Sequence, residues 1–327
     1  MRIRAATVAG AVAVALSMVA GAAGKAAADS SGSSGSFGRG AASPAGVMET
    51  GICAAPAADA ALAAGLSSDI LAAVAGRAGR YAVAVYDAVT GVTCLLNAGS
   101  HFDSASVVKA TILAALLRWH QETGRPLTDE ERALATLMIT QSDNDAATDL
   151  WDEVGRARIE HFLDLAGMTQ TRLGAGPYWG LTQITARDEL TLLRLLTGSN
   201  AVLTGYSRGY ELGLMAQVIP AQRWGVPAGA PAGVTAHVKN GWLPDSSGWH
   251  INSIGAFTGH GRDYMMAVLS DGEPTMGYGV ATIEAVARAV HRDLAPAVPP
   301  ADARLAVTVG PGPSPDAIVP ALPPYVQ

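Results

Sequence analysis

Ser106 and Lys109 are the side chains in this sequence whose types and spacing best fit catalysis. They lie three positions apart in Ser106-Val107-Val108-Lys109, at the start of an apolar segment. In a helix this spacing places the hydroxyl and the amine on one face. A partly buried lysine near the positive end of the helix dipole loses its proton more readily, so it can act as a base toward the serine. The pattern predicts a serine nucleophile whose backbone amide faces a developing oxyanion.

Two further polar patterns downstream could complete such a site. Ser-Asp-Asn occupies positions 142–144 after an apolar helical segment, and Lys-Asn-Gly occupies positions 239–241 at the end of a predicted strand. The alternative for the first pattern is a helix cap, and a cap is compatible with a catalytic role. The alternative for Ser106 and Lys109 is an ordinary helix start with a lysine whose head reaches water.

The elements that must position these residues indicate an α/β fold of the α+β kind. Residues 81–86 form an apolar run in which alanine and valine alternate, and a second apolar run follows Thr90-Gly91, which together predict an antiparallel hairpin. Helices are predicted at 106–120, 129–140, 146–154, 158–166, 186–196 and 280–291, and later strands at 234–239, 252–258 and 264–270. Strands at both ends around a helical middle predict one antiparallel sheet, flanked by helices, with an all-helical insert.

The composition sets aside several classes of function. The chain has 327 residues, 49% of them apolar and 15% charged, and its 22 basic and 28 acidic residues give a net charge of −6. Without a dense basic cluster, this balance argues against a nucleic-acid or anionic-membrane partner. The seven histidines and two cysteines show no H-x-x-x-H or C-x-x-C spacing, so no metal site is expected.

The two ends of the sequence differ from its middle. Residues 1–28 combine two early arginines, a long uncharged Ala/Gly/Val run and a final Ala-Ala-Ala, which predicts a cleaved signal peptide; an uncleaved anchor is the alternative. Residues 29–48 have the composition of a flexible Ser/Gly-rich linker, and residues 295–327 form a Pro-rich tail expected to be disordered. The folded domain is therefore predicted at residues 49–294. The signal peptide predicts that this domain is exported to the outer side of the membrane and is not stably inserted in the membrane after cleavage.

Cys53 and Cys94 are the two cysteines of the sequence. An even pair in an exported chain predicts a disulfide rather than a reactive thiol, and two buried free thiols are the alternative. A bridge across 41 positions would stabilise the fold by about 4 kcal/mol in the chain-entropy model. It is expected to tie the first helix of the domain to the hairpin.

The three polar patterns together resemble a known signature. S-x-x-K, S-D-N and K-T-G in this order are typical of class A β-lactamases and penicillin-binding proteins, the D-alanyl-D-alanine peptidases. The resemblance covers about residues 54–294 and includes the hairpin, the helical insert and the closing helix. It implies a β-lactamase/DD-peptidase-like fold and an acyl-enzyme mechanism with no cofactor.

The resemblance also implies a role for each matching residue. Ser106 corresponds to the acylated nucleophile and Lys109 to its proton acceptor. Ser142 corresponds to the hydroxyl that passes a proton to the leaving nitrogen, and Asn144 to the amide that positions the substrate and Lys109. Lys239 corresponds to the strand lysine that binds a substrate carboxylate and polarises the Ser142 hydroxyl.

The strand pattern also carries the first departure from the family. The amides of Ser106 and Trp242 are expected to form the oxyanion hole, and Asn240 and Gly241 to line the bound substrate. Asn240 stands where the family usually has Thr or Ser, so an amide replaces a hydroxyl that would donate to the carboxylate. This exchange predicts altered substrate affinity.

A second departure concerns release of the acyl group. Class A enzymes use a glutamate on the loop before the helix that corresponds here to 186–196. Residues 171–185 contain no Asp or Glu, and Tyr178 and Trp179 lie there instead, where simple packing is the plain interpretation. An acyl-enzyme without a base to activate water is expected to persist.

Two other functions compete with this interpretation. Gly205-Tyr-Ser207-Arg-Gly209 matches the nucleophile elbow of α/β-hydrolases, with Asp245, His250 or His291 downstream in triad order, but no buried strand precedes it. The second competing function is non-catalytic: the same fold could serve as a module that binds cell-wall peptide or a partner protein. The favoured prediction is an exported, monomeric serine hydrolase of β-lactams or peptidoglycan-type D-Ala-D-Ala amides.

Overall fold

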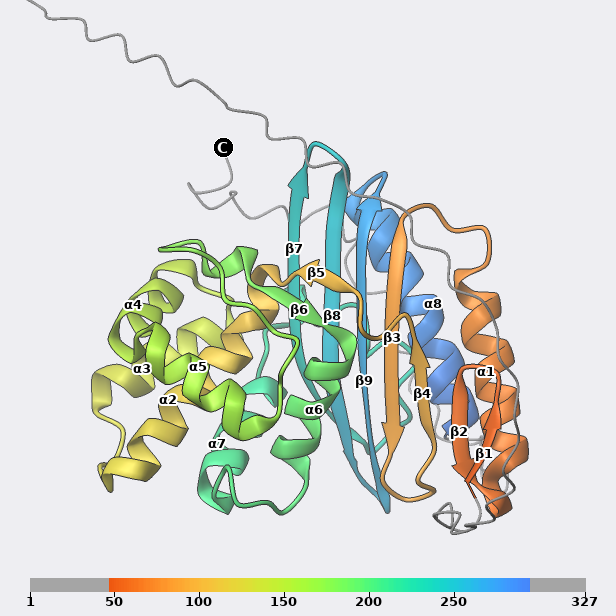
Figure 1. The fold of residues 1–327 in the computed structure, drawn as a ribbon, viewed down its shortest axis with the longest axis horizontal. Coiled ribbons are helices and arrows are strands. Elements are labelled where there is room, and N and C mark those ends of the chain that lie inside the picture. Colours follow the sequence, from red (N-terminus) through yellow and green to blue (C-terminus); the bar gives the residue numbers. More distant parts are fainter. Residues whose placement is uncertain (1–46, 295–327) are drawn as a thin grey trace, which may run out of the picture. The chain divides into compact units, whose positions relative to one another are not determined.

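Seven strands form one antiparallel sheet in the order β1-β2-β4-β3-β9-β8-β7 (Figure 1). The computed structural model describes residues 47–294. The strands of this sheet are β1 (Val47–Thr50), β2 (Cys53–Pro56), β3 (Arg80–Asp87), β4 (Thr93–Leu96), β7 (Thr235–Asp245), β8 (Gly248–Gly259) and β9 (Arg262–Glu273). The central pair β3 and β9 joins an early strand to the last one, in register from Arg80 opposite Asp271 to Asp87 opposite Tyr264. The predicted sheet made by both ends of the chain is confirmed.

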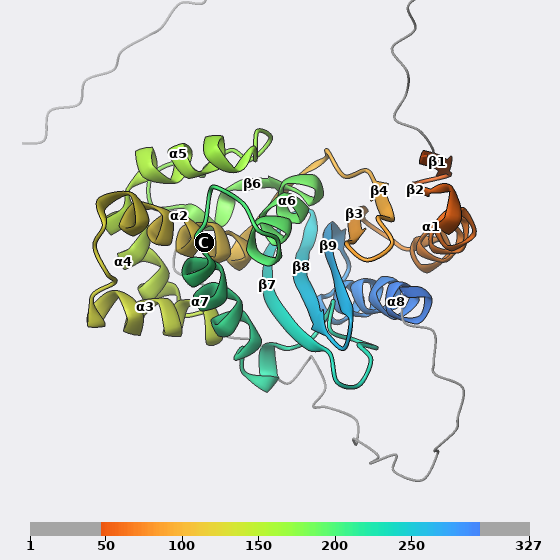
Figure 2. The same cartoon turned by 90° about the horizontal axis from the view of Figure 1, so that it is seen from below.

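Helices cover both faces of this sheet (Figure 2). The first and last helices, α1 (Ala60–Val74) and α8 (Met276–Leu294), pack together on one face. The middle of the chain lies on the other, with α6 (Ala186–Thr197) against β3, β8 and β9. The remaining helices there are α2 (Val108–Thr123), α3 (Asp129–Thr140), α4 (Asn144–Val154), α5 (Arg156–Ala166) and α7 (Gly205–Ala216). The all-helical insert is thus also confirmed.

Alternation along the central strands explains why both faces are apolar. In β3, Val83 and Val85 join the cluster under α1 and α8, whereas Ala82 and Ala84 join the cluster under the helical insert. Successive side chains of a strand point to opposite faces, so a strand covered on both sides is apolar throughout. The small alanines lie on the side where α6 crosses the sheet.

Several short elements and some boundaries differ from the sequence-based expectations. The structure adds α7, a two-stranded sheet of β5 (His101–Asp103) and β6 (Gln183–Thr185), and the 3-10 turns η1 (Ala57–Asp59), η2 (Ala105–Val107), η3 (Trp179–Leu181) and η4 (Pro220–Gln222). Strand β7 runs six residues past Lys239, so the Lys-Asn-Gly pattern lies inside the strand rather than at its end. Pro244 is tolerated there because β7 is an edge strand.

The domain begins slightly earlier than expected. Residues 47 and 48, placed at the end of the predicted linker, belong to β1, which pairs with β2. The rest of that linker, the predicted signal peptide (1–28) and the Pro-rich tail (295–327) lie outside the described residues.

The predicted disulfide between Cys53 and Cys94 is present. The two cysteines face each other across β2 and β4, with their Cα atoms 3.9 Å apart. The expectation that the bridge starts from the first helix was wrong, because Cys53 lies in a strand that precedes that helix. The bridge therefore fastens β2 and, through β2, β1 to the rest of the sheet.

Among the described residues, the helical segment Ala57–Val74 has the length and apolar composition of a membrane span. Its buried residues Ala63, Leu66 and Ile70 recur at helical spacing and face β2, β4 and α8. Their apolar contacts are those of a helix that packs on the core of a domain.

Candidate active site

Ser106 lies on η2, immediately before α2 begins at Val108. The helical start that the spacing predicts is therefore a 3-10 turn that continues into the α-helix. Ala105, the residue before the serine, has a φ of 45°, in the left-handed region that non-glycine residues rarely adopt. Such strain persists only where surrounding contacts hold it, and it is common at functional sites. Ser106 itself is partly exposed at this corner.

Lys109 lies in the first turn of α2 and is completely buried. Its Nζ lies 2.6 Å from the carbonyl oxygen of Ser142, 2.7 Å from Asn144 Oδ1 and 3.3 Å from Ser142 Oγ. Burial, and next the nearby positive charge of Lys239, hold the pKa of Lys109 well below its usual value, while Asp143 opposes them weakly. The neutral form of Lys109 is therefore favoured more than in a solvated lysine, and its N–H groups donate to the carbonyl oxygen of Ser142 and to Asn144 Oδ1.

The turn between α3 and α4 presents both partners of this lysine. Ser142 has a φ of 59°, and this left-handed conformation turns its carbonyl oxygen toward Lys109. Asp143 then caps α4, because its Oδ1 accepts the N–H of Ala146 at 2.8 Å. The Asp of the motif is therefore structural, and Ser142 and Asn144 on either side of it face the lysine.

Lys239 approaches the same serine from β7. Its Nζ donates to Ser142 Oγ at 2.9 Å and to the carbonyl oxygen of Asn240 at 2.9 Å. Burial lowers the pKa of Lys239 to about 7. When Lys239 donates to Ser142 Oγ, the hydroxyl proton of Ser142 is free to point at the lone pair of Lys109. One hydroxyl thus connects two buried amines.

Gly241 explains why the third position of the strand motif must be small. A Cβ at this position would lie 2.6 Å from the carbonyl oxygen of Ser104, 2.8 Å from the amide nitrogen of Ser106 and 2.9 Å from that of Val107. The backbone of β7 therefore touches the backbone that carries Ser106, the candidate nucleophile. Trp242 follows Gly241 directly in β7, so the oxyanion hole predicted from the amides of Ser106 and Trp242 remains an expectation at this contact.

Replacing Gly241 by Ala is expected to slow acylation by about 10²–10³-fold, the usual cost of losing one oxyanion donor. The added methyl must push η2 away from β7, and this would separate the two amides, of Ser106 and Trp242, that are predicted to form the oxyanion hole. The measurement is the second-order rate constant for labelling by a fluorescent penicillin. Gly209→Ala on α7 is the matched control, since its Cβ would meet nothing within 4 Å. A wild-type rate in the Gly241 variant would contradict this arrangement.

Asn252 on β8 is a positioning residue that the sequence did not reveal. It is fully buried, and its Nδ2 donates to the carbonyl oxygens of Asp103 at 2.8 Å and Ser104 at 3.3 Å. These bonds fasten the segment before Ser106 to the sheet. No motif in the sequence signals this contact, because 148 positions separate Asn252 from Ser104.

Asn240 does not line the site as expected. Its side chain is 1% exposed, and its Nδ2 donates to the carbonyl oxygens of Gln222 at 2.8 Å and Trp224 at 2.9 Å. Both N–H groups of the amide are therefore used by the loop before β7, and none remains to replace a hydroxyl donor to a substrate carboxylate. Among the described residues, its Oδ1 is buried without a hydrogen-bond partner.

The loop at 171–185 brings an aromatic ring to Lys109. Trp179 is 4% exposed, and Lys109 Nζ lies 4.8 Å from the centre of its ring. A cation–π contact favours the ammonium form by about 0.5–2 kcal/mol. The opposing effect of burial is larger than that of the aromatic ring, because the pKa of Lys109 is nevertheless well below its usual value.

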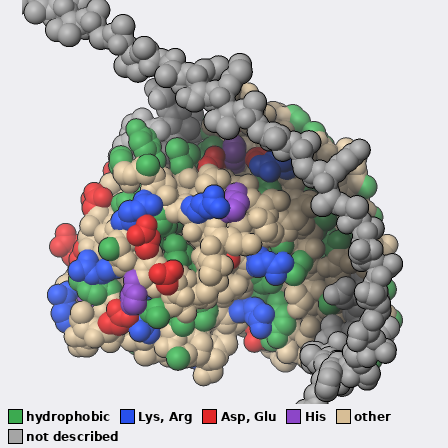
Figure 3. Space-filling view, in the orientation of Figure 1, with side chains coloured by type: hydrophobic (Ala, Val, Ile, Leu, Met, Phe, Trp, Pro, Cys, Tyr) green, Lys and Arg blue, Asp and Glu red, His purple; other side chains and the backbone are tan. Residues whose placement is uncertain are grey.

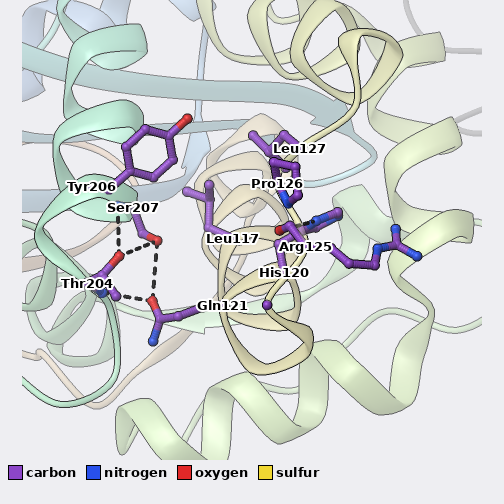
Figure 4. Close-up of a pocket in the computed structure, with 10 residues that line it drawn as sticks. Leu117, His120, Gln121, Arg125, Pro126, Leu127, Thr204, Tyr206 and Ser207 are labelled. Carbon is purple, nitrogen blue, oxygen red and sulfur yellow. Dashed lines mark hydrogen bonds between the residues drawn. The ribbon is translucent and has the colours of Figure 1, made fainter.

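The competing nucleophile, Ser207, lies in another part of the molecule. It is in the first turn of α7, where its Oγ lies 3.0 Å from Thr204 Oγ1 and 3.3 Å from Gln121 Oε1. Figure 4 shows these three residues together at one side of a pocket of about 400 Å³. Gln121 is twelve positions beyond Lys109 along α2, a distance of about 18 Å.

The candidate triad partners of Ser207 are engaged elsewhere. His250 Nε2 lies 2.9 Å from Asp245 Oδ2 at the end of the β7–β8 hairpin. His291 is buried, with Nδ1 2.8 Å from Tyr264 Oη and Nε2 2.8 Å from a backbone carbonyl oxygen. Within the part of the chain that the structure describes, these candidates therefore do not form a triad with Ser207.

Charged side chains are interspersed on the face shown in Figure 3, with basic and acidic groups side by side over the helical insert. Within residues 47–294, no group of three His, Cys, Asp or Glu side chains is arranged to hold a metal ion.

A sequence model of the β-lactamase enzyme family matches residues 130–294, half of the chain. The chain belongs to the β-lactamase enzyme family. This membership confirms the resemblance and the serine-hydrolase class that the three motifs predict. The matched region contains Ser142, Asn144 and Lys239, while Ser106 and Lys109 lie before it.

Solved structures of class A β-lactamases share the fold. A class A β-lactamase from Bacteroides cellulosilyticus has 17% identity and a TM-score of 0.62, covering 70% of this chain and 97% of its own. TLA-1, an extended-spectrum β-lactamase, has 17% identity and a TM-score of 0.64 over 70% and 98%. An ancestral class A β-lactamase has 25% identity and a TM-score of 0.59 over 69% and 98%. A search of curated proteins by sequence found no match.

Proposed function

We propose that this member of the β-lactamase family is an exported serine hydrolase that forms an acyl-enzyme on Ser106 with a β-lactam or a D-Ala-D-Ala-type amide. The observation that carries the proposal is the burial of Lys109 and Lys239 on either side of Ser142. The sequence has 22 basic residues but three lysines, Lys25, Lys109 and Lys239. Lysine can lose its proton on burial and arginine cannot, so the two lysines of the domain lie where a neutral amine is useful.

Acylation follows from this arrangement. Ser106 Oγ attacks the carbonyl carbon, and its proton passes to the neutral Nζ of Lys109. The amides of Ser106 and Trp242 stabilise the charge on the carbonyl oxygen. The carbon–nitrogen bond then breaks, and the leaving nitrogen takes the proton of Ser142 Oγ, which the Lys109 ammonium replaces. The proton removed from the nucleophile thus ends on the leaving group, and both lysines return to their starting state.

Hydrolysis of the acyl-enzyme is expected to be the slow step. No Asp or Glu lies between residues 171 and 185, and the loop instead places Trp179 against Lys109. Loss of a positioned general base typically costs about 10²–10⁴-fold. Lys109 or Ser142 would have to activate water in its place.

Export rests on two observations. The first 28 residues have the composition of a signal peptide, and the domain carries a disulfide between β2 and β4. Disulfides persist in oxidising compartments and are rare in the cytosol. The proposed location is the outer side of the membrane, where a monomer would meet peptidoglycan or β-lactams.

The test is a time course of intact mass after mixing the mature protein with benzylpenicillin. We expect a stoichiometric burst, an adduct with the mass of the whole antibiotic, and release over minutes. A panel of neutral and carboxylate-bearing β-lactams would define the substrate class. We expect only a weak preference for carboxylate-bearing over neutral β-lactams, because both N–H groups of the Asn240 amide already donate to backbone carbonyl oxygens.

Two results would contradict the proposal. Rapid steady-state hydrolysis with no detectable adduct would mean that an unrecognised base activates water at this site. The complete absence of an adduct and of turnover with every β-lactam and peptide tested would favour the non-catalytic binding module.

A further inference from the structure

Trp179 packs its ring against the amine of Lys109. It lies on η3, the turn that packs against the η2 segment carrying Ser106. Its indole is almost completely buried, and its ring centre is 4.8 Å from Lys109 Nζ. Exposed apolar neighbours flank it in sequence, with Tyr178 44% and Leu181 39% exposed. The loop therefore buries Trp179, its largest side chain, while Tyr178 and Leu181 remain exposed.

The indole is held in this place by a hydrogen bond to α4. Its Nε1 donates to Thr148 Oγ1 at 3.1 Å, and the Thr148 hydroxyl donates to the carbonyl oxygen of Asn144 at 3.0 Å. Asn144 in turn accepts from Lys109 through its side chain. The ring, the helix start and the lysine thus form one connected unit.

The backbone of the loop is fixed at both ends. A Cβ on Gly174 would lie 2.0 Å from the carbonyl oxygen of Tyr178, so the loop crosses itself at a point where only glycine fits. The amide of Gly174 donates to Thr182 Oγ1 at 3.1 Å, and the amide of Ser104 donates to the carbonyl oxygen of Thr182 at 2.8 Å. Trp179 is therefore held on the segment that contains the nucleophile.

We propose that Trp179 is a positioning residue that keeps water away from Lys109 and from the ester formed on Ser106, so that the site favours acylation over hydrolysis. The inference rests on the proposed function and names what controls the lifetime of the acyl-enzyme. An apolar ring at this position both removes the solvent that would stabilise a lysine ammonium and occupies space that a hydrolytic water would need.

Other groups around Lys109 do not replace this effect. Lys239 disfavours a second positive charge, whereas Asp143, whose carboxylate caps α4, favours it. Lys239 lies on β7 and Asp143 at the start of α4, so neither belongs to the loop that carries Trp179. Opening the Trp179 side would therefore admit water without altering these charges.

The experiment compares Trp179→Ala with Trp179→Phe, which keeps a ring but lacks the N–H. In Trp179→Ala the adduct half-life with benzylpenicillin should fall on the order of tenfold or more, since water can reach the site. The acid limb of the acylation pH profile should move to higher pH, because a solvated Lys109 holds its proton more strongly. Trp179→Phe should remain close to wild type in both. Trp119→Ala is the control, because it removes a tryptophan near the far end of α2, whose ring contacts Arg125 and Arg158 rather than Lys109.

A second measurement does not depend on acylation. The sequence has three lysines, so NMR of protein labelled with carbon-13 lysine can follow Lys109 directly, assigned with Lys239→Met. Its pKa should rise in Trp179→Ala and stay near wild type in Trp119→Ala. If the Ala variant does not fold, Trp179→Leu serves instead, with a smaller rise.

The outcomes are separable. A Trp179→Ala protein with an unchanged adduct lifetime and an unchanged Lys109 pKa overturns the inference and leaves the proposed function intact. Equal effects in Trp119→Ala would also overturn it, as they would report general loosening. A wild-type protein that never forms an adduct contradicts the proposed function, and the NMR titration then decides the role of Trp179 alone.

Discussion

Ser106→Ala is expected to abolish covalent labelling by a fluorescent penicillin, and Ser207→Ala to leave it unchanged. Only Ser106 begins a helix whose next turn carries a buried lysine, and only its amide lies beside the backbone of Gly241. Ser207 is 3% exposed and bonds to Thr204 and Gln121, neither of which can remove its proton. Loss of the nucleophile removes the acyl-enzyme itself, so the effect is complete.

The pair of variants is matched in chemistry, because each removes one hydroxyl from the first turn of a helix. Labelling is measured by in-gel fluorescence and confirmed by intact mass, with circular dichroism as a check on folding. Persistent labelling of Ser106→Ala together with its loss in Ser207→Ala would overturn the assignment in favour of the elbow-like motif. Labelling of both variants would point to a third nucleophile.

Local patterns in the sequence predicted most of the scaffold. The helix at 129–140 was predicted with its observed bounds, and it is fixed by a local signal, because Thr128 and Glu131 form a capping box. The hairpin of β3 and β4 and the later strands β7, β8 and β9 likewise were predicted from short apolar runs and the turn residues between them. The α7 helix was missed because its first turn, from Gly205 to Gly209, is rich in turn-forming residues and carries few apolar ones.

The site was predicted only in part, because its contacts span long stretches of chain. Lys239 meets Ser142 across 97 positions, and no periodicity within either segment indicates that they touch; the family signature supplied that pairing. The direction of the Asn240 side chain could not be predicted, since the loop carbonyls that hold it are formed by tertiary packing. The sequence predicted that Trp179 is a packing residue, but only the structure shows that its ring packs on the amine of Lys109.

Strain at the site has the same tertiary origin. Ala105 and Ser142 both adopt positive φ, and neither residue type favours it. Their neighbours explain why these conformations persist: Asn252 holds the carbonyls before Ser106, and Lys109 holds the carbonyl of Ser142. A sequence-based argument that uses residue preferences necessarily misses positions where packing overrides them.

Replacing either buried lysine by Met is expected to reduce activity and increase stability. Lys109→Met removes the proton acceptor of Ser106 and should slow acylation by about 10²–10⁴-fold. The same change removes an amine whose ammonium form is strongly disfavoured by burial, so the free energy of unfolding at pH 7 should not fall and is expected to rise. Acylation kinetics and urea unfolding of the same preparation test both effects.

Lys239→Met allows a sharper test, because the pKa of Lys239 in the fold is about 7 against an ordinary value of 10.5. Between these values the unfolded chain binds the proton and the folded chain does not, so the stability of the wild-type protein must rise with pH across this window. Below pH 7 the folded and the unfolded chain both bind the proton. The folded state is then destabilised by about 1.4 kcal/mol for each tenfold decrease in the proton affinity of the buried amine. The Met variant has no amine at this position and avoids this cost. Loss of the bonds to Ser142 and Asn240 offsets part of this gain, by about 1–3 kcal/mol.

Urea unfolding at pH 6 and pH 9.5 should therefore show a rise in wild-type stability that is largely absent from Lys239→Met. Parallel pH dependence in the two proteins would mean that Lys239 keeps its ordinary pKa in the fold, and it could then not share a proton with Ser142 near neutral pH.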